Sequence, residues 1–307
     1  MTQFTGQSEA LQGVVLRPAW AQAVSDLTQM VKPRITLLVA IITAIGYLIA
    51  SPTIDGPGQA TALVWTVLGA TLSCMAAAVF NQAIERRSDA MMHRTADRPV
   101  AAGRVSPAAA HALGWGLTLV GVGLVWAGGG ALAAGVDAFT VASYALLYTP
   151  LKRVTSFSLL VGAVPGALPP VIGYAAAAGR VDAPIVVMFA IMFLWQLPHF
   201  QAIAWLHRED YARGGFPMLS VVDPTGVSVF RQMLLSCVAL LPLGLLPVSM
   251  GMAGPWYFAG ALGAGVLFLV CAIELSLRRS RASARATFLA SLVYLPVVFA
   301  LVVIDGR

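Results

Sequence analysis

The chain has 307 residues, of which 59% are hydrophobic and only 10% are charged, and its mean hydropathy is +0.82. A soluble globular domain carries about 25% charged residues, so this composition excludes that class and indicates a polytopic membrane protein. The net charge of +6 is explained by topology signals in the loops and predicts no nucleic acid partner.

The N-terminal segment differs from a secretory signal peptide. Glu9 and Asp26 interrupt it, and no basic stretch leads into a short apolar core. We expect residues 1–30 to form a cytoplasmic arm with a short interfacial helix near residues 19–30, followed by a membrane domain over residues 31–307. The three cysteines lie inside apolar runs and form no pair typical of a metal or redox site.

Nine apolar runs follow, and each is long enough to cross a bilayer as a helix. They lie near residues 33–50, 61–80, 107–127, 131–149, 158–178, 184–206, 228–250, 255–277 and 286–304. The least certain boundary is the short break at Gly128–Gly130. With the N-terminus in the cytoplasm, 17 of the 19 Lys and Arg residues fall in cytoplasmic segments. The positive-inside rule therefore predicts a cytoplasmic N-terminus and an external C-terminus.

The first polar cluster follows the second apolar run and contains Asn81, Glu85 and Asp89 at intervals of four. On a helix that continues past residue 80, each interval turns the side chain by only about 40°, so the three groups share one face. Carboxylate and amide oxygens suit Mg²⁺, and Arg94 and Arg98 nearby suit phosphate oxygens. The alternative is a solvated helix end with charge pairs.

Two further clusters lie at later helix ends on the same side of the membrane. Lys152 and Arg153 either anchor the chain by the positive-inside rule or bind an anion. His199 is either a packed core histidine or a haem-iron ligand. Five aromatic residues either wall a cavity and stabilise a carbocation or pack in the core and at the membrane interface. They are Tyr144, Tyr148, Phe157, Trp195 and Trp205.

The first cluster resembles a known motif when it is written with its spacing. The run Asn81-x-x-x-Glu85-Arg86-x-x-Asp89-x-x-Met92-x-Arg94-Thr95-x-x-Arg98-Pro99 resembles the first motif of the UbiA superfamily of intramembrane prenyltransferases. Its Met-x-Arg-Thr-x-x-Arg ending is similar to the branch that farnesylates haem. The element Tyr-x-x-x-Lys-Arg-x-Thr at 148–155 and the segment 195–219, with Trp-Gln-Leu-Pro-His-Phe and Arg-Glu-Asp-Tyr, resemble the same branch.

This resemblance, which extends from about residue 32 to residue 303, implies an all-α fold of nine transmembrane helices around a central cavity open to the cytoplasmic side. It implies a bacterial inner-membrane enzyme that transfers the farnesyl group of farnesyl diphosphate to a vinyl group of haem B, with Mg²⁺ as cofactor. The products would be diphosphate and haem O for haem-copper terminal oxidase biogenesis. The implied partners are the two substrates, the lipid bilayer, and a downstream haem A synthase or oxidase assembly factors.

The same resemblance implies roles for individual residues. Metal would be held by Asn81, Glu85, Asp89 and Asp210, and diphosphate by Arg94, Arg98, Lys152, Arg153 and Arg208. The catalytic set would be Asn81, Glu85, Asp89, Lys152 and Asp210. Haem would contact His199, Gln196 and His207, with Tyr148, Trp195 and Trp205 lining the cavity. The chain departs from most of the superfamily at Phe200 and His207, which stand near the acidic positions of a second metal motif.

Two other functions stay open. The first is a UbiA-type prenyltransferase that acts on an aromatic quinone precursor, and the second is a haem or isoprenoid carrier without catalysis. The Trp-Gln-x-Pro-His-Phe and Arg-Glu-Asp-Tyr segments favour haem over a quinone precursor. The acidic ladder favours catalysis, because a carrier needs no site for a leaving diphosphate.

Overall fold

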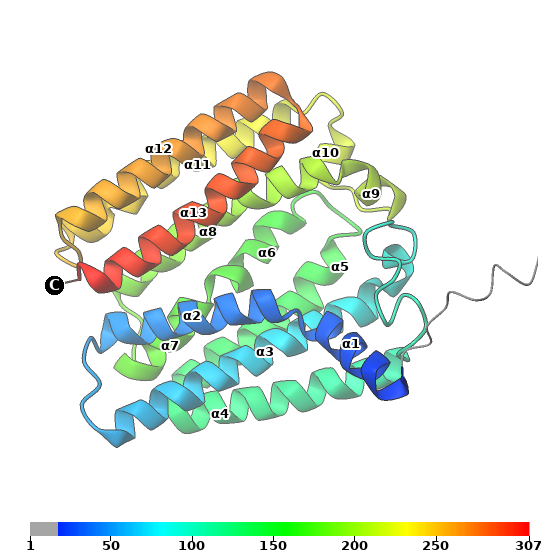
Figure 1. Cartoon of the computed structure of the whole chain (residues 1–307). Coiled ribbons are helices and arrows are strands. Elements are labelled where there is room, and N and C mark those ends of the chain that lie inside the picture. The colour runs from blue at the N-terminus through cyan, green and yellow to red at the C-terminus, as the bar shows by residue number, and fades with distance from the viewer. Residues whose placement is uncertain (1–17, 307) are drawn as a thin grey trace, which may run out of the picture.

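The computed structural model describes residues 18–306, which are arranged mainly as helices (Figure 1). The longer helices are α1 (Ala19–Val31), α2 (Pro33–Ala50), α3 (Pro57–Asp89), α4 (Pro107–Ala142), α6 (Ser158–Ala167), α7 (Pro169–Ala178), α8 (Ala183–Leu206), α11 (Val227–Ser249), α12 (Pro255–Arg278) and α13 (Arg281–Ile304). The shorter ones are the π-helix η1 (Ser143–Tyr148), α5 (Thr149–Leu151), α9 (Arg208–Arg213) and α10 (Leu219–Val222). Of the expected N-terminal arm, residues 1–17 lie outside the described part, and α1 follows where an interfacial helix is expected.

Within residues 18–306, eight helical segments are long and apolar enough to cross a bilayer, with mean hydropathies between 1.6 and 2.5. Their backbone hydrogen bonds are satisfied within each helix, as a hydrocarbon environment requires. This finding confirms an all-helical polytopic membrane protein. One of the eight is α3, which begins at Pro57 and continues without a break to Asp89, well beyond the end of its apolar run.

Another of the eight segments, Pro107–Leu151, is 45 residues long and reverses its direction at Gly130. Gly130 has a φ of 73° and a ψ of −173°, a conformation that residues with a Cβ rarely adopt. The reversal occurs at the Gly128–Gly130 break between two expected spans. The segment Pro107–Leu151 is therefore one of the eight by length, but it consists of two antiparallel helices.

Contacts with α3 show the two directions of this segment. Trp115 packs on Phe80 with ring centroids 5.4 Å apart, and Gly128 lies against Ala62 near the start of α3. The first half therefore runs antiparallel to α3. The second half brings Ala145 back into one apolar cluster with Phe80. The chain thus returns to the level at which it entered α4.

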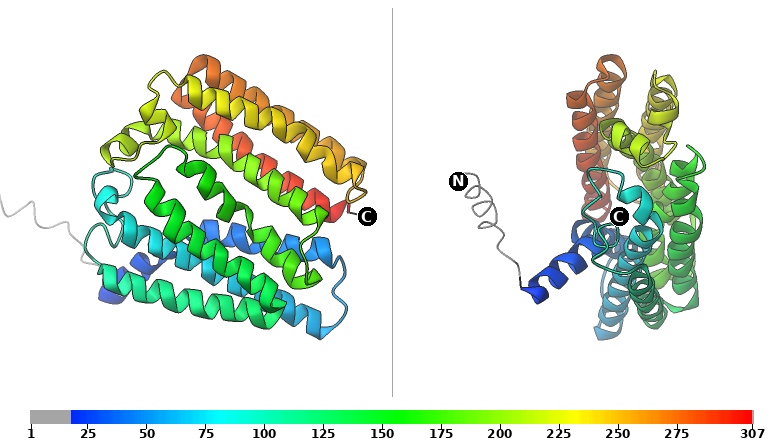
Figure 2. Two further views of the ribbon diagram at one scale, coloured as in Figure 1. Left: turned by 180° about the vertical axis from the view of Figure 1, so that it is seen from behind. Right: turned by 90° about the vertical axis from the view of Figure 1, so that its right-hand side faces the viewer.

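The helices pack in two groups. Helices α2, α3, α4 and α7 contact one another in the first group, and α8, α11, α12 and α13 do so in the second (Figure 2). Helix α6 contacts both α8 and η1 and so connects the groups. In the first group, α2 and α7 approach backbone to backbone, because Gly46 faces Pro170 and Gly173 faces Thr43. The second group contains most of the large apolar core cluster.

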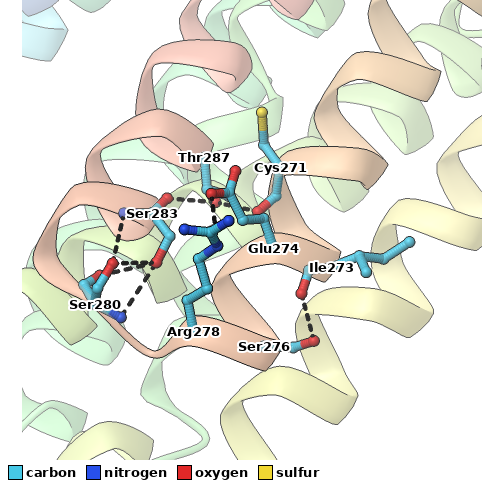
Figure 3. A network of polar contacts seen from close by, with 8 residues as sticks. All are labelled: Cys271, Ile273, Glu274, Ser276, Arg278, Ser280, Ser283 and Thr287. Atoms are coloured by element: carbon cyan, nitrogen blue, oxygen red, sulfur yellow. Dashed lines mark hydrogen bonds and ion pairs between the residues drawn. The ribbon is translucent and has the colours of Figure 1, made fainter.

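The turn between α12 and α13 is fixed by short polar contacts (Figure 3). The Ser280 side chain caps α13 by accepting a backbone hydrogen bond from its first turn. Thr287 Oγ1 donates to the Cys271 carbonyl at 2.9 Å, which links α13 to α12. On the α12 surface, Glu274 and Arg278 form an ion pair of 3.2 Å one turn apart. These contacts set the pairing of the last two long helices.

Two polar segments meet at one end of the bundle, which we call the loop end. They are the loop at 90–106 between α3 and α4 and the segment at 207–226 that contains α9 and α10 (Figure 1). The backbone N–H of His93 donates to Asp210 Oδ1 at 3.2 Å and so joins them. The end of α13 lies at the other end of the bundle, where the Gly254 N–H donates to the Asp305 carbonyl at 2.9 Å.

Candidate active site

The carboxylate ladder occupies the last turns of α3. Asn81, Glu85 and Asp89 are 2%, 3% and 0% exposed. The spacing predicted a shared helix face, and the continuous helix provides it. A solvated helix end would leave these side chains in water, so that alternative does not fit the structure.

Two cations from other segments approach the ladder. Lys152 Nζ lies 2.9 Å from Glu85 Oε1, and Arg98 Nη1 donates to both Asp89 oxygens at 2.8 Å. Burial on its own lowers the pKa of the Lys152 ammonium, but Tyr148 and Glu85 outweigh burial and hold this pKa well above its usual value. The ladder is therefore an electrically balanced cluster of buried charges.

The π-helix η1 brings Lys152 to this place. Thr149 Oγ1 donates to the Tyr144 carbonyl at 2.8 Å, five residues back. The Tyr144 and Tyr148 rings lie 5.1 Å apart, and Lys152 Nζ lies 4.6 Å from the centre of the Tyr148 ring. A π-helical turn shifts the side chains that follow it, and such turns occur often at functional sites. Sequence reasoning named the two tyrosines and Lys152 but not the π-helix.

The donor set of the ladder fits a magnesium ion. Among the described residues, the buried Asn81 amide nitrogen has no hydrogen-bond partner, and Glu85 Oε1 meets Lys152 only as an ion pair. No group of three or more His, Cys, Asp or Glu side chains that could hold a metal occurs in residues 18–306. Two carboxylates and one amide would therefore leave part of the shell to diphosphate oxygens and water, which is the usual arrangement for Mg²⁺.

Sequence reasoning missed one member of this site, Lys32, and counted it only as a topology signal. Lys32 connects α1 to α2 in the left-handed conformation, with a φ of 51°. Burial and the positive charges of Arg98 and Lys152 lower the pKa of its ammonium to about 8, whereas Glu85 and Asp89 act in the opposite direction. The charge of its ammonium therefore interacts with those of the ladder carboxylates and their two cations. The one available signal was its rarity, because the chain has only two lysines.

The other expected diphosphate residues lie further from the carboxylates. Arg153 is exposed and donates to the Ile84 carbonyl of α3 at 3.2 Å. Arg94 lies 5.9 Å from the centre of the Tyr211 ring, and Arg208 lies over the Trp205 ring. Of the five basic residues expected to bind diphosphate, Arg98 and Lys152 are therefore the two that contact the ladder in this structure.

Asp210 occupies a different position from the one expected of a metal ligand. It lies in α9, where it accepts from the Arg213 guanidinium and from the His93 backbone N–H. The hydrogen bond from Arg213 holds the pKa of Asp210 below its usual value. The α9 turn directs its carboxylate toward the 90–106 loop, where the His93 N–H meets it. Asp210 thus joins the two segments of the loop end.

The buried polar residues of α8 contact α13 and α6. His199, 8% exposed, has Nδ1 2.7 Å from Ser291 Oγ, and its ring stacks on Trp195 with centroids 4.8 Å apart. Trp195 Nε1 donates to the Ser291 carbonyl at 2.8 Å. Gln196 Nε2 donates to the Ala163 carbonyl of α6 at 3.3 Å. His199 Nε2 has no partner in residues 18–306, which leaves that nitrogen available to a ligand.

The remaining expected haem and cavity residues separate into different environments. His207 is half-buried at the junction of α8 and α9, where burial and the charge of Arg94 lower its pKa. Trp205 packs on Phe230 at 4.8 Å within the large apolar core, which fits core packing better than a cavity wall. Phe157 is 68% exposed, which fits the membrane-interface alternative better than an enclosed cavity wall.

Two hollows lie away from the ladder. One, of about 560 Å³, lies between α6, α8 and α11 and includes Phe157, Arg231 and Gln232. The other, of about 530 Å³, lies between α1 and α4 and includes Asp26 and Arg104. Neither is lined by the three ladder residues, and the central cavity stays a prediction.

Comparisons with known proteins identify relatives that match nearly the whole chain. The model of the UbiA prenyltransferase family matches residues 39–295. A protoheme IX farnesyltransferase of Solibacter usitatus is 44% identical over 286 residues, which cover 91% of this chain and 98% of the relative. The enzyme of the same name from Salinibacter ruber is 41% identical over 281 residues, covering 91% and 98%.

Solved structures share the fold at low sequence identity. A digeranylgeranylglyceryl phosphate synthase matches with a TM-score of 0.76 at 16% identity, over 92% of this chain and 98% of that one. A UbiA homolog from Archaeoglobus fulgidus bound to GPP and Mg²⁺ matches with a TM-score of 0.61 at 11% identity, over 90% and 99%. These likenesses show a common arrangement of helices, and the substrate has to be argued from closer relatives and from the site.

Proposed function

The chain belongs to the UbiA prenyltransferase family, and we propose on that premise that it transfers the farnesyl group of farnesyl diphosphate to a vinyl group of haem B. The observation that carries this proposal is the near full-length similarity to protoheme IX farnesyltransferases, at 44%, 41% and 40% identity for three of them. The chain is a prenyltransferase and a multi-pass membrane protein. The products are haem O and diphosphate.

We place the diphosphate at the ladder. Asn81, Glu85 and Asp89 would hold Mg²⁺, which supplies positive charge to the diphosphate as it leaves. Lys152 and Arg98 already lie within 2.9 Å of the carboxylates, so small side-chain movements would carry them to the phosphate oxygens. Lys32 adds a third cation from the start of α2. A homolog from Archaeoglobus fulgidus binds GPP together with Mg²⁺, which supports Mg²⁺ as the partner of the diphosphate.

We place haem against α8. His199 Nε2 would bind the iron, while Ser291 holds Nδ1 and so fixes the ring orientation, as second partners do for ligating histidines. Gln196 and His207 would contact the edge of the macrocycle. The vinyl carbon then forms a bond to C1 of the farnesyl group while the C–O bond to diphosphate breaks. Water adds to the resulting carbocation and releases one proton, which gives the hydroxyethylfarnesyl product.

The membrane topology follows from the reversal at Gly130. Eight helical segments with one internal reversal give nine crossings, and an odd number places the start of α2 and the end of α13 on opposite faces of the membrane. Helix α2 begins at the loop end, since Gln82 Nε2 of α3 donates to the Gln29 carbonyl of α1 at 3.0 Å. Most Lys and Arg residues lie at this end. The positive-inside rule therefore puts the loop end and the active site in the cytoplasm.

One incubation tests the function against both alternatives. The purified chain receives haem B, farnesyl diphosphate and Mg²⁺, and in parallel an aromatic quinone precursor in place of haem, and mass spectrometry identifies the products. We expect haem O from the first mixture and no prenylated product from the second. Haem retained without haem O would support a carrier, and a prenylated aromatic product would support the quinone enzyme.

A further inference from the structure

Arg104 lies in the loop between α3 and α4, away from the ladder, and makes three charge-assisted contacts. Its Nε donates to Asp26 Oδ1 of α1 at 2.9 Å. Its Nη1 donates to the Asp97 carboxylate at 2.8 Å, and its Nη2 donates to the Asp97 carbonyl at 2.7 Å. The planar guanidinium therefore fixes a side chain of one helix and the backbone of a loop at the same time.

The contact with the Asp97 carbonyl connects Arg104 to the active site through the peptide group between Asp97 and Arg98. That carbonyl belongs to the planar unit that also contains the Arg98 nitrogen, so a bond to one fixes the orientation of the other. Arg98 in turn holds both oxygens of Asp89 at 2.8 Å. On the other side of the same turn, Thr95 Oγ1 donates to the Asp89 carbonyl at 3.0 Å. Arg104 thus helps to direct the Arg98 guanidinium.

The contact with Asp26 acts on helix α1. Asp26 is 6% exposed on α1, whereas the apolar Trp20 and Val24 of the same helix are 72% and 58% exposed. The helix therefore directs a carboxylate toward the protein although two of its large apolar side chains point away, so the ion pair helps the buried Met30 to specify how α1 docks. Helix α1 ends at Lys32, the third cation of the site. Its docking therefore also decides where Lys32 lies.

We propose that Arg104, through Asp26 and Asp97, is a positioning residue for the prenyl diphosphate. It sets Arg98 against Asp89 and sets the docking of α1, which ends at Lys32, without contacting the substrate. This inference rests on the proposed placement of diphosphate at the ladder. A purely structural contact would instead affect the amount of folded protein and leave the kinetics of the folded fraction unchanged.

The test uses full-length protein in detergent with Arg104→Gln, Arg104→Lys and Asp26→Asn. Arg180→Lys is the matched control, because Arg180 forms an exposed ion pair with Asp182 at the other end of the bundle. Two quantities are measured: the affinity for inorganic diphosphate with Mg²⁺ by calorimetry, and KM for each substrate together with kcat. The binding measurement needs no haem chemistry.

We expect Arg104→Gln to weaken diphosphate binding and to raise KM for farnesyl diphosphate about tenfold, with kcat and KM for haem unchanged. Arg104→Lys keeps the positive charge but loses the planar guanidinium that contacts Asp26 and Asp97 together. Its diphosphate affinity and its KM for farnesyl diphosphate should therefore lie between those of wild type and Arg104→Gln. Asp26→Asn should also weaken diphosphate binding and raise KM for farnesyl diphosphate. This variant provides the test if Arg104→Gln does not fold. Unchanged diphosphate affinity in folded variants, or equal rises in both KM values, would overturn the proposal. If wild type forms no haem O but the variants still lose diphosphate affinity, the proposed reaction fails and the positioning role stands.

Discussion

The polar clusters at the ends of α3 and α8 occupy equivalent places but have opposite chemistry. Each lies within a long membrane helix toward the loop end, and each is next to a similar short run, Phe80 to Ile84 in α3 and Phe200 to Ile203 in α8. The α3 cluster contains buried carboxylates matched with cations. The α8 cluster contains a hydrogen-bonded histidine and glutamine and no carboxylate.

This difference is informative because buried charges are costly. Removing a carboxylate and its partner from water costs several kcal/mol per ion, and their attraction offsets that cost only with good geometry. A fold that needed only to connect helices would use neutral groups, as the end of α8 does. The α3 cluster is therefore suited to a charged ligand and the α8 cluster to a large, mostly apolar one. The predictions below test this division, from the largest expected effect to the smallest.

Removal of a ladder charge should have the largest effect. We expect Glu85→Gln and Asp89→Asn each to lower kcat by about 100- to 1,000-fold, because each removes a group that stabilises developing charge. Haem O formation measured by mass spectrometry gives the rate, and the amount of protein in membranes reports folding. Glu274→Gln, which breaks a surface ion pair on α12, is the control and should keep normal activity. Near-normal rates in both ladder variants would remove the diphosphate site from α3.

Substitution of His199 should affect haem and leave diphosphate unaffected. His199→Ala removes the candidate iron ligand, so we expect a shift of the haem absorption bands and a rise in KM for haem of about 10- to 100-fold. Ser291→Ala should shift the haem bands and raise KM for haem by less, because it removes only the contact that fixes the orientation of the imidazole ring. Diphosphate affinity should stay at the wild-type value in both. An unchanged haem spectrum in His199→Ala would leave this histidine a packing residue.

The pH dependence should follow the α3 cluster. The pKa of Lys32 lies at about 8 in the substrate-free protein, so its charge is present below this pH and is lost as pH rises through it. We therefore expect kcat/KM for farnesyl diphosphate to fall by up to about tenfold above pH 8. The groups that face Lys32 are Arg98, Lys152, Glu85 and Asp89. Lys32→Arg, which stays charged, should abolish this decline, and the same decline in Lys32→Arg would assign it to another group.

The smallest effect is expected at Asp210. If this carboxylate joins the two polar segments, Asp210→Asn should lower kcat by only a few-fold and increase proteolytic cleavage within residues 90–106. The number of Mn²⁺ ions bound in the presence of diphosphate should equal that of wild type. Binding of one Mn²⁺ ion fewer by Asp210→Asn would instead indicate a metal site near α8 and α9. The α3 cluster would then not be the one metal-binding cluster of the two.

The sequence predicted those features that depend on local spacing. The ladder follows from intervals of four on a helix, and the break at Gly128–Gly130 follows from glycine content, so both are found as expected. Lys32 was missed because its place in the site depends on a left-handed residue and on the docking of α1. The contacts of Asp210 with His93, 117 positions earlier, have no local signal. For Phe157 the sequence left a cavity wall and the membrane interface open, because apolar character does not distinguish a cavity from lipid.

The balanced ladder has a consequence for the order in which ligands bind. Free Mg²⁺ has to compete with Lys152 and Arg98 for Glu85 and Asp89. The displaced Lys152 and Arg98 would then have no anionic partner. When the ion arrives with diphosphate, the same cations find new partners on the phosphate oxygens. Each ligand should therefore raise the affinity for the other by the same factor, as thermodynamic linkage requires. The substrate-free enzyme would then bind free Mg²⁺ weakly and the Mg²⁺–diphosphate complex tightly.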